Sequence, residues 1–593
     1  MSLQQSVLLL ILVGLLVFLV WGRWRYDIVA LGVLFIAGLA GVVPQSELFT
    51  GFGNPATITV ALVLIVSQGL TRSGAVDFVL PVLKPLQARP FMHISALTFL
   101  AAFLSMFMNN VGALALLMPI AIQSTTKAGR PPATVLMPLS FGSILGGLVT
   151  LIGTPPNILI ASYRQDVTGE AFGMFDFSAV GSVVALAGIA FMLLLGWRLV
   201  KVRKQSAGLE LFDVEGYLFE LKVTKDSDLI EMTSGELKKE LRKHKLDLLA
   251  LEYRKKLTKL IRLTDEKPLR VGMRLMIQGG HDEVQEYADA HELHLLTAQN
   301  SVTGVLHSDA KEIIEVVVTP NSPLVGSTPE NIRFNTTFGV NLIAASRSGN
   351  PHRNVLRRFK FDVGDVLLLH GEEEKLQEAV GRMNCYPLAE RSIRLKNNDK
   401  AALALAVFSL AILAVALGLV SIQLALGIAT VAFALGRVLP IQEFYTGIDW
   451  PVVVLLGAMI PLGAALETTG TTDLLVTGVL NVAGELSPVF IIALLLVITM
   501  TVSDVLNNAA TAILMAPIAY NIATSLELNP DAFLMAIAVG ASSAFLTPIG
   551  HQNNALIMGP GGYKFSDYWR MGLPLEIIIV AVSIPMLLWI WPL

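Results

Sequence analysis

Long apolar runs recur along the chain on both sides of a polar middle. A helix needs about 20 apolar residues to cross a bilayer, and the runs predict transmembrane helices at about 3–20, 27–43, 55–70, 178–200, 402–420, 422–440, 450–466 and 572–592. Asn, Gly and Pro interrupt two further apolar segments in each block, at 91–123 and 134–160, then at 487–524 and 532–560. The first run lacks the basic start and small-residue cleavage site of a signal peptide, so we expect it to be a retained helix.

Composition and charge support a membrane protein. Hydrophobic residues make up 54% of the chain and charged residues 15%, against roughly 25% charged in soluble domains. Residues 201–400 contain 31 of the 43 Lys and Arg residues. The net charge of -3 gives no electrostatic case for a nucleic-acid partner. A single cysteine, Cys385, excludes an intramolecular disulfide and a cysteine-based metal cluster.

The distribution of basic residues predicts the topology. If 91–123 and 487–524 are re-entrant hairpins, each apolar block has five crossings, and the two blocks are inverted because five is odd. Eleven of the twelve basic residues outside 201–400 then lie on the same side as that polar block, and only Arg164 lies on the other. By the positive-inside rule, residues 201–400 are cytoplasmic and both termini are extracytoplasmic. The predicted units are a membrane repeat at 1–200 with an inner hairpin, a cytoplasmic domain at 201–400, and a membrane repeat at 401–593 with an outer hairpin.

The two membrane blocks also match in sequence. Asn109-Asn110 corresponds to Asn507-Asn508, and Ile152-Gly153-Thr154-Pro155-Pro156-Asn157 corresponds to Ile549-Gly550-His551-Gln552-Asn553-Asn554, at offsets of 398 and 397 residues. Inverted repeats with broken helices in matching positions are typical of secondary transporters.

The paired asparagines are candidate binding residues. They lie midway through their segments, where a hairpin tip would reach the middle of the bilayer. Helices that begin at Val111 and Ala509 would direct positive dipole ends at an anion, and carbonyls freed near Gly153 and Gly550 suit sodium. Interhelical hydrogen bonding is the alternative role for the asparagines, but their symmetric occurrence favours a binding site.

Polar residues near the tips are weaker candidates. Asp504 would ligate a cation or carry a proton, because carboxylates within membranes are functional by default; a solvated place in the outer mouth is equally compatible. His551 is a candidate donor to an oxyanion or a partner of a carbonyl. Glu576 and Asp27 are predicted to be interfacial. The hydroxyls of the nearby Ser and Thr residues are candidate donors, with helix back-bonding as the alternative: Ser105, Ser503, Thr154 and Thr547.

The polar middle is itself predicted to be repeated. Two copies, at about 215–293 and 309–385, alternate short strand-like runs with charged helical stretches. Each copy is small, so pairing the two is a plausible way to bury a core. The chain has no phosphate-binding glycine loop, which disfavours an ATP-driven pump, and we predict a regulatory role for this α+β domain.

The membrane motifs resemble those of the divalent anion:sodium symporters, the sodium/sulfate and sodium/dicarboxylate cotransporters. The resemblance covers both membrane blocks and rests on Phe107-Met108-Asn109-Asn110-Val111, Leu151–Asn157, Leu506-Asn507-Asn508-Ala509, Thr547–Asn554 and Gly559–Tyr563, in that order. It implies an all-α polytopic membrane protein of the inverted-repeat elevator type, a homodimer in membrane lipid. The middle copies resemble the C-terminal subdomain of TrkA/RCK regulators, which is found in bacterial members, and this implies a bacterial inner membrane and a possible nucleotide ligand.

The resemblance also implies roles for individual residues. Sodium site 1 comprises Asn110, Gly153 and Thr154, and sodium site 2 comprises Asn508, Thr547 and Gly550. The anion is held by Asn109, Asn110, Val111, Asn507, Asn508, Ala509, Asn157, Asn554 and His551. The family's tips carry Ser-Asn-Thr; here Asn replaces the Ser, and Val111 and Ala509 replace the Thr. A dicarboxylate would lose two donors worth about 1 kcal/mol each, which favours sulfate.

Several functions therefore compete. Sodium-coupled symport of a small divalent anion, with sulfate favoured, comes first. The alternatives within transport are a sodium/dicarboxylate symporter and a proton-coupled anion carrier that uses Asp504. A channel would need a selectivity filter such as T-V-G-Y-G, which the chain lacks. A membrane enzyme would need more than Asp504 and His551.

Overall fold

The computed structural model describes most of the chain. The described residues are 1–21, 24–74, 89–200, 218–244, 246–253, 256–259, 268–278, 281–296, 312–320, 322–347, 350–351, 359–388, 400–440, 444–445, 447–483 and 487–593. Contacts divide the chain into a membrane unit, Met1–Arg203 with Ser392–Leu593, and an inserted unit, Lys204–Arg391.

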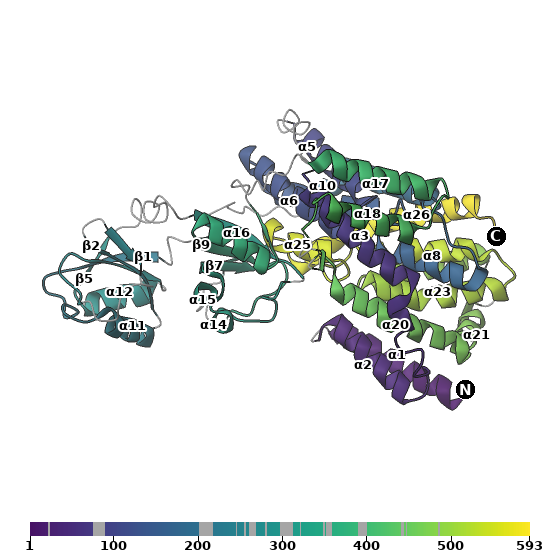
Figure 1. Ribbon diagram of the computed structural model, residues 1–593, viewed down its shortest axis with the longest axis horizontal. Helices are drawn as coiled ribbons and strands as arrows, with labels where there is room; N and C mark the ends of the chain where they lie inside the picture. Colours follow the sequence, from purple (N-terminus) through teal and green to yellow (C-terminus); the bar gives the residue numbers. More distant parts are fainter. Residues whose placement is uncertain are drawn as a thin grey trace. The chain divides into compact units, whose positions relative to one another are not determined.

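Helices make up the membrane unit (Figure 1). Its first half contains α1 (Leu3–Trp21), α2 (Tyr26–Leu39), α3 (Pro55–Arg72), α5 (Pro90–Ser105), α6 (Asn110–Lys127), α7 (Ala133–Gly147), α8 (Pro155–Thr168), α9 (Ser178–Phe191) and α10 (Trp197–Leu199). Its second half contains α17 (Ala401–Ala416), α18 (Ile422–Leu435), α20 (Trp450–Thr468), α21 (Thr471–Ala483), α22 (Pro488–Ser503), α23 (Asn508–Ser525), α24 (Pro530–Ala541), α25 (Gln552–Gly561) and α26 (Tyr568–Ile590).

Four helical segments among the described residues are long and apolar enough to cross a membrane by length and composition: Pro55–Arg72, Ser178–Leu199, Trp450–Thr468 and Phe565–Ile590. Most of the other apolar helices have 10 to 17 residues. Many of these helices are short because Asn and Pro set where they begin: Pro favours the first helical position, and Asn caps the helix. The segments 91–123 and 487–524 each fold as two helices separated by four residues, with the paired asparagines at the break.

The two halves use the same helix packing. The hairpin helix α5 packs along α7, and α22 packs along α24. Glycines allow the close approach: a Cβ at Gly146 would lie 2.1 Å from the Ala102 carbonyl oxygen, and one at Gly540 would lie 3.0 Å from the Leu496 carbonyl oxygen. Small residues let helix backbones approach in this way in membranes. Residues 532–541 of α24 are buried throughout, so this helix lies inside the unit.

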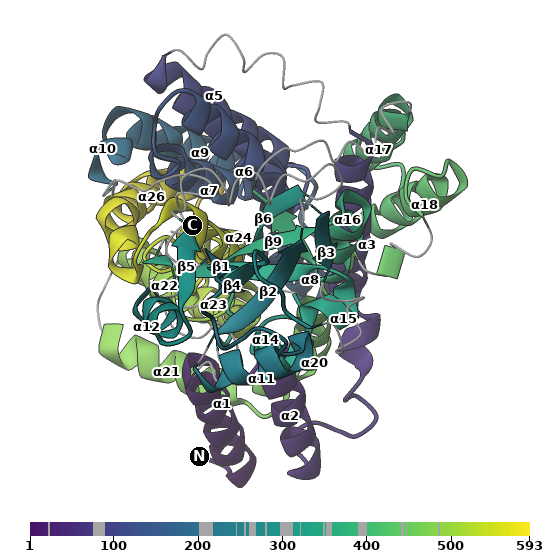
Figure 2. The ribbon, with the colours of Figure 1, turned by 90° about the vertical axis from the view of Figure 1, so that its left-hand side faces the viewer.

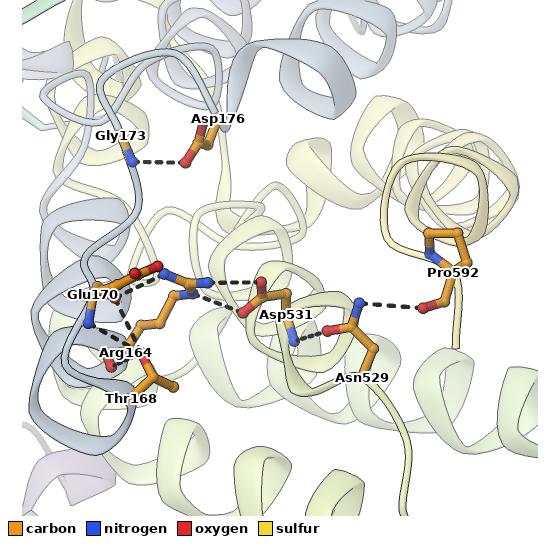
Figure 3. A network of polar contacts seen from close by, with 8 residues as sticks. All are labelled: Arg164, Thr168, Glu170, Gly173, Asp176, Asn529, Asp531 and Pro592. Carbon is orange, nitrogen blue, oxygen red and sulfur yellow. Dashed lines mark hydrogen bonds and ion pairs between the residues drawn. The ribbon is translucent and has the colours of Figure 1, made fainter. Parts of the chain in front are cut away.

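An ion pair joins the two halves away from the hairpins. Arg164 of α8 donates from Nε to Asp531 Oδ1 at 2.7 Å and from Nη2 to Oδ2 at 3.0 Å, and its Nη1 donates to the Glu170 carbonyl (Figure 3). Asp531 begins α24, where Asn529 caps it. Arg164 is the one basic residue that the predicted topology places opposite the others. Its charge is neutralised by a fork-to-fork pair with a carboxylate.

The inserted unit contains two five-stranded antiparallel sheets of the same strand order. The first has the order β3-β2-β4-β1-β5 and the second β8-β7-β9-β6-β10. The strands are β1 (Leu218–Val223), β2 (Asp247–Tyr253), β3 (Lys256–Lys259), β4 (Arg274–Gln278), β5 (Leu293–Leu296), β6 (Glu312–Val318), β7 (Asn341–Arg347), β8 (Asn350–Pro351), β9 (Val366–Gly371) and β10 (Cys385–Pro387). In Figure 2 the central β4 is seen between β1 and β2.

Local details recur in both sheets. The strand next to the centre carries a register shift between Leu248 and Ala250 in the first sheet, and between Leu342 and Ala344 in the second. Their helices are α11 (Ser234–Lys243), α12 (His281–Ala290), α14 (Pro329–Ile332), α15 (Phe334–Phe338) and α16 (Glu373–Arg382). Each sheet encloses its own apolar core.

Cys385 provides a test of the second sheet's packing. The residue is 5% exposed, and its Sγ lies 3.5 Å from the Met383 carbonyl oxygen. Burial raises the pKa of the thiol to about 12, so very little reactive thiolate exists near neutral pH. We expect no maleimide labelling of the folded protein and complete labelling after denaturation. A Thr336→Cys variant, at an exposed position, serves as the reactive control, and rapid labelling of Cys385 itself would contradict the packing.

Candidate functional site

The two hairpin tips have the same backbone capping. The first tip is Met106–Asn109 and the second tip is Asp504–Asn507, between the helices of each hairpin. The side-chain oxygen of Asn109 accepts from the Val111 N–H at 3.1 Å, and that of Asn507 accepts from the Ala509 N–H at 2.9 Å. These are N-caps. The first asparagine of each pair therefore begins a helix, and the N–H groups of Val111 and Ala509 already have partners.

The second asparagine of each pair is held by a serine. Ser105 Oγ donates to Asn110 Oδ1 at 2.6 Å, and Ser503 Oγ donates to Asn508 Oδ1 at 2.9 Å. The alternative of helix back-bonding is therefore wrong for these two serines, because their hydroxyls turn toward the tip. Asn110 is 2% exposed, whereas Asn508 is half-buried.

Two loops break the helices that face the tips. The first loop, Leu148–Thr154, separates α7 from α8, and the second loop, Ser542–His551, separates α24 from α25. Asn157 Nδ2 donates to the carbonyls of Gly147 and Thr150 at 3.3 and 2.9 Å. Asn554 Nδ2 donates to the carbonyls of Ala544 and Thr547 at 3.2 and 3.1 Å. One side-chain amide thus spans each loop.

Each loop is also attached to the tip of its own repeat. Thr150 Oγ1 donates to the Met106 carbonyl, and Thr547 Oγ1 donates to the Asp504 carbonyl. Gly550 lies against the second tip, since a Cβ there would be 2.6 Å from the Ser503 carbonyl oxygen. Gly147 lies against Asn110, with its missing Cβ 2.5 Å from Asn110 Oδ1. These close approaches exclude a side chain at either glycine.

The second loop also reaches the first tip. His551 Nε2 lies 3.2 Å from Asn110 Nδ2, and Asn553 Nδ2 donates to the Asn110 carbonyl at 3.2 Å. His551 Nδ1 accepts from the Asn553 N–H at 3.1 Å. Residues 441 positions apart in sequence are thus in contact.

Residues in the middle of α7 also form hydrogen bonds with the second repeat. Ser140 Oγ donates to Asn554 Oδ1 at 2.9 Å, and Asn553 Nδ2 donates to Ser143 Oγ at 2.6 Å. Among the described residues, four buried side-chain oxygens in or beside the tips and loops have no hydrogen-bond partner: Asn157 Oδ1, Asn553 Oδ1, Asp504 Oδ2 and Ser542 Oγ. Orphaned buried oxygens require an explanation, and a bound ion is one of the usual ones.

The acidic residues lie elsewhere than their sequence positions suggested. Asp504 is 3% exposed and is not solvated in the outer mouth; its Oδ1 accepts from the Leu546 N–H at 2.9 Å. Glu576 is 8% exposed and lies two turns inside α26, which begins at Tyr568; Asp27 is 6% exposed. Both are buried within the protein, and their interfacial positions stay predictions.

Sequence reasoning missed part of this site. Asn553, Ser140, Ser143 and Glu576 all belong to its hydrogen-bond network. Asn553 had a signal, because it adjoins Asn554 in the matched loop. For Ser140 and Ser143, the sequence signal was limited to their being polar residues within an apolar segment.

The membrane unit contains long apolar helices, and in it two capped hairpin tips face two broken helices. This is the arrangement of a membrane transporter. A model of the citrate transporter family matches residues 16–540. The chain belongs to this family, which lies within the divalent anion:sodium symporter superfamily. The family resemblance seen in the tips and loops is therefore confirmed, and the protein is a multi-pass membrane transporter.

Individual relatives extend this picture. The chain is 30% identical over 590 residues to an uncharacterized transporter of Synechocystis sp., covering 98% of this chain and 96% of the relative. It is 24% identical to a putative sulfur deprivation response regulator of Chlamydomonas reinhardtii, covering 92% and 95%. A probable sodium/sulfate cotransporter of the same alga is 25% identical and covers 55% of this chain and 38% of its own length.

Proposed function

We propose that the protein is a sodium-coupled symporter of a small divalent anion and that sulfate is its substrate. The observation that carries this proposal is the pair of serine-held tip asparagines, Asn110 and Asn508, each facing a broken helix in its own repeat. The sodium/sulfate cotransporters among its relatives support the choice of ion and anion.

The anion would be held by side-chain amides. Ser105 donates to the amide oxygen of Asn110, and Ser503 shares its single hydroxyl proton between the amide oxygen of Asn508 and the Ala541 carbonyl. With its oxygen on the serine, the NH2 group of Asn508 would face a bound anion. Val111 and Ala509 add no hydroxyl. Sulfate accepts hydrogen bonds on all four oxygens, so dispersed amide donors suit it better than they suit the separated carboxylates of a dicarboxylate.

Sodium would be held by oxygens of the tips and loops. We assign site 1 to Asn110, Gly153 and Thr154, and site 2 to Asn508, Thr547 and Gly550. The orphaned Asn157 Oδ1 is an additional oxygen next to site 1, of the hard type that sodium prefers. The amides of Asn157 and Asn554 are engaged with loop carbonyls, so their proposed role is to hold those carbonyls in position.

The remaining features of the proposal concern the whole molecule. We propose an elevator mechanism and a homodimer in a bacterial inner membrane, with the inserted unit cytoplasmic and both termini extracytoplasmic. The two equal sheets of that unit would act as paired TrkA-C-like regulatory domains, with a nucleotide as the candidate ligand.

A carboxylate substrate is the second candidate, and the name of the family, citrate transporter, favours it. Uptake of radiolabelled sulfate into proteoliposomes, with and without an inward sodium gradient, separates the candidates when unlabelled succinate and citrate are added as competitors. Sodium-dependent uptake that neither competitor reduces supports the sulfate symporter. Inhibition by either acid favours the carboxylate, and uptake that follows a proton gradient without sodium favours the proton-coupled carrier.

The missing hydroxyls at the tips give a prediction about selectivity. A Val111→Thr, Ala509→Thr double variant places a donor on each side of the anion, each worth about 1 kcal/mol. We expect succinate to inhibit sulfate uptake about tenfold or more better in this variant than in the wild type. A Val111→Ile, Ala509→Ser double variant, with a hydroxyl at one tip only, should lie between the two. Equal succinate inhibition in all three proteins would contradict the role given to these positions.

A further inference from the structure

A buried pair of carboxyl groups lies beside the second loop. The carboxyl groups of Asp504 and Glu576 are electrostatic neighbours of each other. Consecutive backbone amides bring them together: Phe545 N–H donates to Glu576 Oε1 at 3.2 Å, and Leu546 N–H donates to Asp504 Oδ1 at 2.9 Å. Asp504 is 3% exposed, Glu576 is 8% exposed, and Asp504 Oδ2 has no hydrogen-bond partner.

The first repeat has no carboxyl group at the two matching positions. Thr150 Oγ1 bonds the Met106 carbonyl just as Thr547 Oγ1 bonds that of Asp504, so Met106 occupies the place of Asp504. The missing Cβ of Gly181 lies 2.3 Å from the Leu148 carbonyl oxygen, and that of Gly572 lies 2.4 Å from the Phe545 carbonyl oxygen. Four residues after each glycine, the first repeat has Ala185 and the second has Glu576.

The charges of this pair need a counterpart. Two carboxylates in contact repel each other, and burial of uncompensated charge is costly. Among the described residues, no basic side chain is an electrostatic neighbour of either group. The two amide donors offset only part of the charge of an ionised pair, so one further positive charge, a proton or a bound cation, balances it.

The pair is connected to the predicted sodium site 2. Asp504 accepts from the Thr547 hydroxyl through its carbonyl, and a Cβ on Gly550 would lie 2.8 Å from Asp504 Cα. The second loop also reaches the surface of the structure, because Ile549 is 66% exposed.

We propose that Asp504 and Glu576 bind a monovalent cation between their carboxylates, at a site that only the second repeat contains and that is separate from sodium sites 1 and 2. The inference rests on the proposed function in its choice of sodium as the ion. Asp504 Oδ2 is the free ligand, and the Glu576 carboxylate is the second. The backbone amides of Phe545 and Leu546 hold the other oxygens in place.

Equilibrium binding of radioactive sodium to the purified full-length protein in detergent, at one neutral pH, tests this site. Asp504→Asn and Glu576→Gln keep Oδ1 and Oε1 as acceptors for the two amides, so both variants should fold, which their unfolding midpoints will verify. We expect each variant to bind one sodium ion fewer per chain than the wild type. Glu527→Gln, which removes an exposed carboxylate of the same repeat, should bind as the wild type does.

The outcomes distinguish this site from the proposed function. If Asn508→Ala loses a sodium ion while Asp504→Asn and Glu576→Gln lose none, sodium site 2 stands and the carboxyl site is overturned. Unchanged sodium binding with an altered pH dependence of uptake would place a proton between the carboxyls and also overturn it. If both carboxyl variants lose a sodium ion but uptake by the wild type needs no sodium gradient, the cation site is supported and sodium-coupled symport is contradicted.

Discussion

Asn508→Ala is expected to abolish sodium-dependent sulfate uptake and leave the protein folded. The variant removes the tip amide that we assign both to the anion and to sodium site 2. It leaves little strain behind, because Ser503 Oγ still donates to the Ala541 carbonyl at 2.6 Å and Asn508 is half-buried. Uptake into proteoliposomes and the unfolding midpoint in detergent are the two measurements.

Asn521→Ala is the matched control, since this asparagine lies on the same helix and its amide donates to the Pro517 carbonyl one turn earlier. It should transport as the wild type does. Asn110→Ala should abolish uptake equally, but with a lower unfolding midpoint, because Asn110 is buried against Ser105 and His551. Normal uptake by either Asn508→Ala or Asn110→Ala would contradict the assignment of that tip to the binding site.

Asn554→Ala is expected to cost clearly more stability than the equivalent substitution in the first repeat, Asn157→Ala. The Asn554 side chain, fully buried, accepts from Ser140 Oγ and donates to the carbonyls of Ala544 and Thr547. Each buried group left without a partner costs about 1–3 kcal/mol. The unfolding midpoint should fall clearly, and uptake should fall with it because the loop carbonyls lose their brace.

Asn157→Ala is the matched comparison in the other repeat. Like Asn554, Asn157 donates to two loop carbonyls, but its Oδ1 has no hydrogen-bond partner, so the substitution removes two bonds rather than three. Its unfolding midpoint should therefore fall less than that of Asn554→Ala. Adding sodium should stabilise the wild type more than Asn157→Ala if this oxygen contributes to site 1. A larger loss for Asn157→Ala would contradict the hydrogen-bond assignment of the two loops.

Much of the site was visible in the sequence because its local structure is set by nearby residues. A side chain two positions away caps each tip helix, and an amide seven to ten positions away spans each loop. Such contacts recur wherever the same short motif recurs, so the matched motifs identified both tips and both loops. The helix α21 (Thr471–Ala483) was not predicted, because its polar first turn interrupts the apolar pattern.

The sequence by itself determined the class of membrane protein, the two broken segments in each half and the family. These follow from the apolar runs, whose burial in lipid needs no distant partner, and from capping and turn chemistry that acts within a few residues. Only the tertiary structure decided which residues meet across the molecule. The contact of His551 with Asn110 joins residues 441 positions apart, and the pairing of Asp504 with Glu576 depends on α26 packing against α22 and α24. No periodicity or motif spacing encodes such contacts, because they depend on how whole helices pack rather than on the residues between them.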